Sequence, residues 1–238
     1  MAHVTDTESP VAVVAGVGPG LGASLARRFA REGCRVALFA RSEAYVEGLA
    51  DDLPDPGEGL GVRVDLGNPA SIRQGFERVR EAFGPVDLLV NHASASPWDG
   101  LLDCTVRDFD DALDVGVRGA FCCSQEAVSD MLDAGGGTVV FTGATTSVRG
   151  RKGAVAFSAA KFGARGLAES MARELGPEGI HVAHVVLDGG ILPPDREVDD
   201  PENYLDPDAI ADSYWHLATQ DRSAWTLELD LRPHTESF

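Results

Sequence analysis

Short, continuous apolar runs alternate with stretches of helical periodicity along almost the whole chain. The apolar runs predict strands over residues 11–15, 35–40, 61–66, 86–91, 138–142, 181–187 and 224–231. The stretches between them carry apolar residues three and four positions apart and predict helices over 21–32, 42–52, 68–83, 107–132, 153–175 and 207–218. Strands that are apolar throughout are typical of a parallel sheet covered on both faces. The pattern therefore predicts an α/β fold, a Rossmann-like doubly wound parallel sheet of about seven strands between two helical layers.

Two segments do not follow this alternation. Residues 1–10 are polar and acidic and lack the basic start and apolar stretch of a secretory signal. We therefore expect a flexible N-terminal leader over 1–10 and a single nucleotide-binding domain over 11–238. Residues 192–208 are rich in Pro and Asp. Two interpretations remain open for them, a solvated surface loop and a mobile flap over a substrate pocket.

Composition restricts the partners that such a domain can have. Acidic residues outnumber basic ones by 38 to 20, which gives a formal charge of −18. This surface repels phosphate backbones and anionic lipids, so we expect no nucleic-acid partner and no membrane partner. The four cysteines lack the spacing of zinc ligands. They indicate reduced thiols in the cytoplasm and no metal site.

A glycine-rich turn joins the first predicted strand to the first predicted helix. Glycine lets the backbone turn sharply and approach a ligand closely, and the helix start offers free N–H groups and a positive dipole. This strand–turn–helix context predicts a binding site for the pyrophosphate of a dinucleotide. Its residues are Gly16, Gly18, Gly20, Leu21 and Gly22.

The end of the second predicted strand indicates which dinucleotide is bound. A carboxylate at this position would bind the ribose hydroxyls of NAD. The chain instead has Arg41, whose guanidinium can pair with a 2′-phosphate, followed by Ser42, which can add a hydroxyl donor. We therefore expect NADP(H) to be favoured over NAD(H).

The spacing of Gly16, Gly20 and Gly22, together with Phe157 and Lys161 four residues apart on a predicted helix, resembles the short-chain dehydrogenase/reductase family. The resemblance extends over about residues 11–231. It implies that further residues contact the cofactor at its adenine, ribose or carboxamide. These are Asp65, Leu66, Asn91, Ala93, Lys161, Gly189 and Ile191. His92, next to Asn91, is expected to be structural.

The same resemblance shows that the catalytic groups are incomplete. The family's Tyr-x-x-x-Lys signature has Phe157 in the place of Tyr, and the family's Ser and Asn positions hold Ala144 and Gly116. Only Lys161 remains. A positioned general acid contributes roughly 10²–10⁴ in rate, so ordinary carbonyl reduction is expected to be impaired.

Other groups could replace the missing proton donor. Thr145 is the first choice, because a one-residue shift of the strand end would bring its hydroxyl toward the Ala144 position. Asp188, in the place of the family's Pro, is the reserve acid or base. Lys161 could itself supply a proton if burial lowered its pKa.

Three functions remain open. The first is an NADP-dependent oxidoreductase with a non-standard active site, acting on a small-molecule substrate. The second is a cofactor-binding protein without turnover, a sensor or the inert subunit of an oligomer. The third is a non-redox enzyme on this fold. The family also implies a homodimer or homotetramer, and a stripe of small residues suits either such an interface or packing within the chain. The stripe consists of Ala156, Ala160, Ala164 and Ala168.

Overall fold

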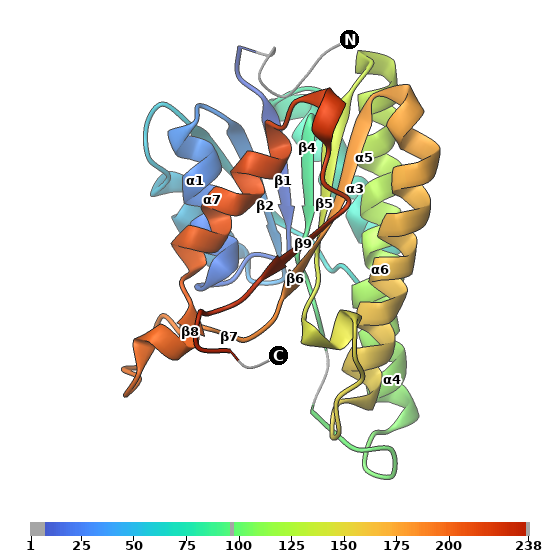
Figure 1. The fold of residues 1–238 in the computed structure, drawn as a ribbon. Coiled ribbons are helices and arrows are strands. Elements are labelled where there is room, and N and C mark those ends of the chain that lie inside the picture. Colours follow the sequence, from blue (N-terminus) through green and yellow to red (C-terminus); the bar gives the residue numbers. More distant parts are fainter. Residues whose placement is uncertain (1–7, 96–97, 237–238) are drawn as a thin grey trace.

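The computed structural model describes residues 8–95 and 98–236 and shows strands and helices in regular alternation (Figure 1). The strands are β1 Val11–Ala15, β2 Arg35–Ala40, β3 Glu58–Arg63, β4 Leu88–Asn91, β5 Gly137–Thr142, β6 Ile180–Leu187, β7 Gly190–Ile191, β8 Tyr204–Leu205 and β9 Glu228–Leu231. The α-helices are α1 Leu21–Arg31, α2 Glu43–Asp51, α3 Pro69–Ala82, α4 Val106–Leu113, α5 Ala120–Ala134, α6 Val155–Leu175 and α7 Pro207–Ala218.

Seven strands form one parallel sheet in the order β3-β2-β1-β4-β5-β6-β9. The order changes direction at β1, which pairs with β2 on one side and with β4 on the other. Ala15 at the end of β1 is therefore in register with both Phe39 and Asn91. At such a switch point the loops leaving two strand ends diverge and leave a crevice for ligands. The prediction of a doubly wound sheet of seven strands is confirmed.

Helices cover both faces of this sheet, and each face has its own apolar core (Figure 1). The helices α1, α2 and α7 pack on one face, and α3, α5 and α6 pack on the other. All five residues of β1 and all eight of β6 are buried, which is why these strands are apolar or small at nearly every position. Among the described residues, no helix has both the length and the apolar character needed to cross a bilayer.

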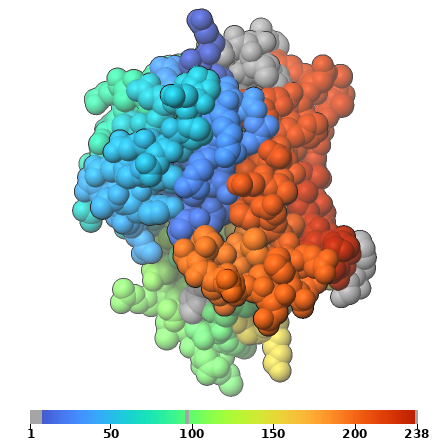
Figure 2. Space-filling view, turned by 90° about the vertical axis from the view of Figure 1, so that its left-hand side faces the viewer, coloured from blue at the N-terminus to red at the C-terminus, as the bar shows by residue number. Residues whose placement is uncertain are grey.

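The two ends of the domain meet on one face. Figure 2 shows the blue N-terminal segments beside the orange and red C-terminal ones. Arg28 on α1 donates to Asp212 on α7 at 2.6 Å, and the rings of Phe29 and Trp215 lie 6.1 Å apart. The C-terminal part of the chain therefore contributes to the core on this face of the sheet, through α7 and β9.

The predicted long helix over 107–132 is confirmed, with a π-helical segment inside it. The structure has α4, then a π-helical segment Asp114–Gly119, then α5. A Cβ atom at Gly119 would lie 2.3 Å from the carbonyl oxygen of Leu66, and one at Gly116 would lie 3.2 Å from the Cβ of Ala160. The π-helical segment thus lies close to its neighbours at these two glycines, and glycine is also a poor former of regular helix.

Other segments also differ from the prediction. The third strand is Glu58–Arg63, so both its ends lie earlier than predicted. Its Gly59 lies so close to α2 that a Cβ there would be 2.3 Å from the carbonyl oxygen of Ala50. The last strand begins at Glu228, since residues 222–224 form a 3₁₀ turn. Within residues 192–208, Tyr204–Leu205 forms β8 and pairs with β7, so this segment is not wholly a loop.

The expected leader is only partly described. Residues 1–7 lie outside the described residues. The carbonyl oxygens of Ser9 and Pro10 accept hydrogen bonds from Arg35, so the chain is already attached to β2 at these two residues. The small-residue stripe on α6 is buried within the chain at every position, from 0% to 5% exposed. Of its two interpretations, packing within the chain is confirmed.

Candidate functional site

The turn after β1 has a conformation and an environment that only glycine allows. Gly16 has a φ of +107°, and a Cβ atom there would lie 2.6 Å from the backbone of Ala93 in the loop after β4. The N–H groups of Gly16 and Val17 both donate to the carbonyl oxygen of Phe39, at 3.0 and 2.9 Å. The loops leaving β1, β2 and β4 are therefore held together at this turn.

The start of α1 has the features of an anion site. Gly20 is its N-cap, no side chain caps the helix, and its first turn holds no acidic residue. A Cβ atom at Gly18 or Gly20 would meet open space, whereas one at Gly22 would lie 2.9 Å from the Cα of Val17. The free N–H groups of the first turn thus face an open approach. These residues fit the pyrophosphate of a dinucleotide.

The neighbouring strand ends offer groups for the adenosine half of such a cofactor. Arg41 and Ser42, at the end of β2, are exposed, and the Ser42 side chain does not cap α2. Asp65, beyond β3, is also exposed and accepts the N–H of Gly67 through Oδ1 at 3.0 Å. Leu66, beside it, is buried. The charged and polar groups predicted for the 2′-phosphate and the adenine are therefore accessible.

Asn91 is buried at the end of β4. Its amide donates to the Ser124 hydroxyl at 3.0 Å, and its Oδ1 is a buried oxygen without a partner among the residues described. Next to it lies a cavity of about 10 Å³, lined also by Gly116 and Lys161. This is about the smallest space that holds one water molecule. The glycine in the place of the family's Asn thus leaves a gap between Asn91 and Lys161.

A larger cavity of about 760 Å³ opens at the carboxyl edge of β4, β5 and β6. It brings together most of the residues predicted to be catalytic or to contact the nicotinamide, although they come from distant parts of the chain. Its lining includes Ala144, Thr145, Phe157, Lys161, Asp188, Gly189 and Ile191, together with His92, Trp98, Thr142, Arg149 and Arg151. The volume is in the range of ligand pockets.

Lys161 is 7% exposed, and its ammonium donates to the backbone carbonyl of Thr142 at 2.8 Å. Burial lowers the pKa of Lys161 from 10.5 to about 8, because the charged form loses its hydration. The Nζ atom also lies 5.6 Å from the centre of the Phe157 ring. The phenyl ring in the place of the family's Tyr therefore offers Lys161 a cation–π contact and no proton.

Phe157 belongs to an aromatic wall of the cavity. Its ring lies 5.5 Å from that of Trp98, which is 56% exposed, and the Arg151 guanidinium stands 4.9 Å above the Trp98 ring. The two aromatic rings thus lie side by side, with the Arg151 cation over Trp98 at one end and the Lys161 cation over Phe157 at the other. The wall offers apolar area to a flat ligand.

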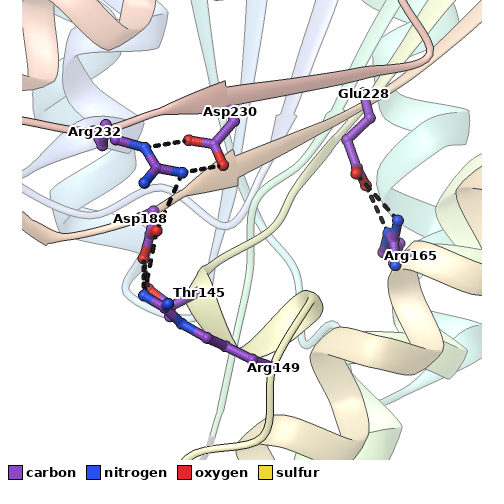
Figure 3. A network of polar contacts seen from close by, with 7 residues as sticks. All are labelled: Thr145, Arg149, Arg165, Asp188, Glu228, Asp230 and Arg232. Atoms are coloured by element: carbon purple, nitrogen blue, oxygen red, sulfur yellow. Dashed lines mark hydrogen bonds and ion pairs between the residues drawn. The ribbon is translucent and has the colours of Figure 1, made fainter. Parts of the chain in front are cut away.

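Asp188 is the centre of an ion-paired network, shown in Figure 3. Its carboxylate accepts the Thr145 hydroxyl at 2.6 Å and pairs with Arg149 at 3.3 Å and Arg232 at 3.4 Å. Arg232 pairs in turn with Asp230 on β9 at 2.6 Å. The Thr145 hydroxyl thus donates to Asp188 in this structure. In this arrangement Thr145 is bonded to Asp188, and Asp188 is also paired with two arginines.

A second ion pair connects the edge strand β9 to α6, the helix that carries Lys161. Arg165 on α6 donates to Glu228 on β9 at 2.6 and 3.1 Å (Figure 3). His184 on β6 also contacts this carboxylate, at 3.0 Å through Nδ1. These bonds fix α6 relative to the sheet, and so they contribute to the position of Lys161.

Sequence reasoning missed one polar chain at the cavity. The Tyr214 hydroxyl on α7 donates to Thr142 Oγ1 at 2.9 Å, and Thr142 Oγ1 lies 3.2 Å from His92 Nδ1. Burial, and then the charge of Lys161, lower the pKa of His92 to about 4. Thr142 is separated from Tyr214 by 72 residues and from His92 by 50. No local pattern in the sequence indicates such a contact.

A family model described as short chain dehydrogenase matches residues 10–194. The chain belongs to the short-chain dehydrogenase/reductase family. This family match includes the glycine turn, Lys161 and the three altered positions at Gly116, Ala144 and Phe157. It stops before α7, which carries Tyr214.

Relatives and solved structures agree with this assignment. A 3alpha-hydroxysteroid dehydrogenase of Mediterraneibacter gnavus is 29% identical over 93% of this chain and 94% of its own. A short-chain dehydrogenase structure from Rhodopseudomonas palustris is 32% identical, with a TM-score of 0.84 over 96% of this chain and 100% of its own. An alcohol dehydrogenase from Thermococcus sibiricus, complexed with 5-hydroxy-NADP, is 25% identical, with a TM-score of 0.87 over 97% of this chain and 99% of its own.

Proposed function

We propose that the protein is an NADP(H)-dependent oxidoreductase that acts on a small molecule without a tyrosine proton donor. The observation that carries this proposal is the combination of two features at one sheet edge. An uncapped helix start lies beside the exposed Arg41, and a cavity of about 760 Å³ contains the buried Lys161. A protein that had abandoned its dinucleotide would have no need of the open glycine turn or of a lysine buried at a cost in free energy.

The cofactor assignment follows from the groups available along that edge. Gly18 and Gly20 leave space for the pyrophosphate, Arg41 and Ser42 suit a 2′-phosphate, and Asp65 suits the adenine amino group. The Thermococcus sibiricus relative, whose structure contains an NADP derivative, supports the same choice. When bound, NADPH supplies a hydride.

The chain's own residues determine which reactions are possible. Phe157 and Ala144 cannot donate a hydrogen bond to a substrate oxygen through their side chains, and the Thr145 hydroxyl is already bonded to Asp188. Substrates that need little acid assistance, such as an iminium ion or a strongly activated alkene, therefore fit best. For them, orientation within the cavity supplies most of the rate enhancement.

A second function, cofactor binding without turnover, is supported by the altered positions at Gly116, Ala144 and Phe157. A sensor or an inert subunit would retain the glycine turn and Arg41 and could lose all three catalytic groups. Oxidation of NADPH that depends on a substrate separates the two functions, because only the oxidoreductase consumes the cofactor.

We also propose a homodimer or homotetramer formed through α5 and α6. Phe121 on α5 and Phe162 on α6 are 44% and 43% exposed, although phenylalanine side chains are usually buried.

The four cysteines are free, and Cys34 and Cys123 are buried. Free thiols are usual in a reducing compartment, which supports a cytoplasmic location.

Calorimetric titration with NADPH and NADH tests the cofactor proposal. We expect NADPH to bind more tightly than NADH, and Arg41→Ala to weaken NADPH by about 10-fold to 100-fold, the value of a charge-assisted contact. Arg107→Ala is the matched control, since Arg107 is an exposed arginine on α4. Equal affinities for both dinucleotides in the wild type would reject the NADP preference, and no binding of either would reject the oxidoreductase.

A further inference from the structure

His92 is the residue of the cavity whose role the family resemblance does not supply. It lies directly after β4, its backbone N–H donates to the carbonyl oxygen of Ala15 at 3.0 Å, and it is one of the residues that line the cavity. Nδ1 faces Thr142 Oγ1 at 3.2 Å. The other ring nitrogen, Nε2, has no partner among the residues described. Which nitrogen carries the proton therefore decides what His92 offers to a ligand.

The buried hydroxyls behind His92 determine that tautomer. Tyr214 is fully buried, and Thr142 is 5% exposed. The Tyr214 proton goes to Thr142 Oγ1, and the Thr142 proton then has one acceptor left, the unprotonated Nδ1 of His92. If Nδ1 carried the proton, one of the two buried hydroxyl groups would lose its acceptor, which is unfavourable in a dry interior. The chain of bonds thus places the ring proton on Nε2.

We infer that His92 presents this Nε2–H to the cavity as a fixed hydrogen-bond donor for a substrate carbonyl oxygen. The inference deepens the proposed oxidoreductase function and rests on it. His92 shares the cavity with Ala144 and Phe157, the two positions that lack the family's hydroxyl donors. An N–H group that is already oriented stabilises an oxygen as negative charge develops on it. His92 gives a hydrogen bond in this role and transfers no proton.

The charged surroundings keep the ring neutral. Lys161, from α6, is the cation that faces His92, and Tyr214, from α7, is uncharged because burial raises its pKa well above the ordinary value. Burial and the Lys161 charge lower the pKa of His92 to about 4. The donor is therefore present at every pH at which the protein would be assayed near neutrality.

The tautomer can be measured without any activity. The chain has six histidines, so a ¹⁵N-histidine spectrum is simple, and His92→Phe assigns the signal of interest. We expect a neutral ring with the proton on Nε2 between pH 6 and 8. Thr142→Val removes the acceptor of the Tyr214 proton and the partner of Nδ1, so it should give a mixture of tautomers. A wild-type ring protonated on Nδ1, or one that titrates near pH 6.5, would overturn the inference.

The donor role is measured by adding acetophenone to protein saturated with NADP⁺, which cannot reduce the ketone. The Nε2 signal of His92 should shift, while that of the control His216, on the outer part of α7, should not. With a substrate found by NADPH oxidation, His92→Phe should lower kcat/KM by about 10²-fold to 10³-fold with NADPH affinity unchanged. Thr142→Val should lower it less, since it acts only by positioning His92.

The outcomes separate this inference from the proposed function. No shift of the Nε2 signal with acetophenone, or full activity of His92→Phe, would reject the donor role and leave NADPH-dependent oxidation standing. A wild type that binds no NADPH would reject the proposed function, whereas the tautomer would still be tested by the spectrum alone.

Discussion

Lys161 shows how much a single side chain is altered by its position. The chain has only two lysines, Lys152 and Lys161, and the first is exposed while the second is buried. Burial lowers the pKa of Lys161 to about 8. Labelling lysine with ¹³C at the ε-carbon should thus give two resonances, of which the one from Lys161 titrates near pH 8. If neither resonance titrates near pH 8, Lys161 is hydrated and the prediction is wrong.

The same shift predicts how stability depends on pH. Below pH 8 Lys161 is charged in the folded and the unfolded state, so folding carries the full cost of burying the ammonium. Between pH 8 and about 10.4 the folded state holds fewer protons than the unfolded state, and that cost disappears as the pH rises. Lys161→Met should therefore raise the free energy of unfolding by about 1–3 kcal/mol at pH 7 and by much less at pH 10. Lys152→Met, the control in urea unfolding, should change little at either pH.

Phe157 and Ala144 allow the family's missing groups to be restored. The double substitution Phe157→Tyr with Ala144→Ser places a phenol beside Lys161 and a hydroxyl at the Ser position. It should raise the rate of NADPH-dependent reduction of simple activated ketones by about 10²-fold, the lower end of the effect of a general acid. Gly116 would still lack the family's Asn side chain, so a full family rate is not expected. A double variant that binds NADPH without gaining this activity would show that the active site is placed wrongly.

At the scale of elements, two glycines of the turn before α1 are expected to have different roles. Gly16 is needed for folding, and Gly18 leaves space for the cofactor. Gly16 has a positive φ and contacts the backbone of Ala93, so Gly16→Ala should lower the free energy of unfolding by about 2 kcal/mol or more. Gly18 has open space at its Cβ position. Gly18→Ala should therefore leave stability unchanged and weaken NADPH at least about 10-fold, since its methyl group would occupy the approach of the pyrophosphate.

Denaturant unfolding and calorimetric titration of these two variants form one matched experiment. The prediction is contradicted if Gly16→Ala is as stable as the wild type, or if Gly18→Ala binds NADPH normally. The second result would mean that the pyrophosphate does not approach this side of the turn.

Sequence patterns predicted two kinds of element: those that depend on contacts between residues close in sequence, and those that are buried on both faces. The apolar strands, the glycine turn and the helix that carries Lys161 belong to these two kinds. The π-helical segment between α4 and α5 was not predictable, because the residue that Gly119 approaches, Leu66, follows a different strand. The contact of Tyr214 with Thr142 was hidden for the same reason, since only the folded sheet brings α7 to the end of β5.

At the scale of the whole molecule, the formal charge of −18 opposes the proposed oligomer. Salt screens this repulsion, with a Debye length of about 30 Å at 0.01 M and about 8 Å at 0.15 M, whereas contacts of Phe121 and Phe162 across an interface would be little affected by it. Light scattering should therefore show a dimer or tetramer at 0.15 M NaCl and a larger monomer fraction at 0.01 M.

A pair of variants identifies the surface responsible. Phe121→Glu with Phe162→Glu should give a monomer at both salt concentrations, because it buries charge in the proposed interface. Leu101→Glu with Leu102→Glu adds the same charge at residues that are 78% and 96% exposed before α4, and it should retain the oligomer. If both double variants remain oligomeric, the subunits meet on another face. If the wild type is monomeric at every salt concentration, the interface proposal fails while the cofactor site, which lies within one chain, is unaffected.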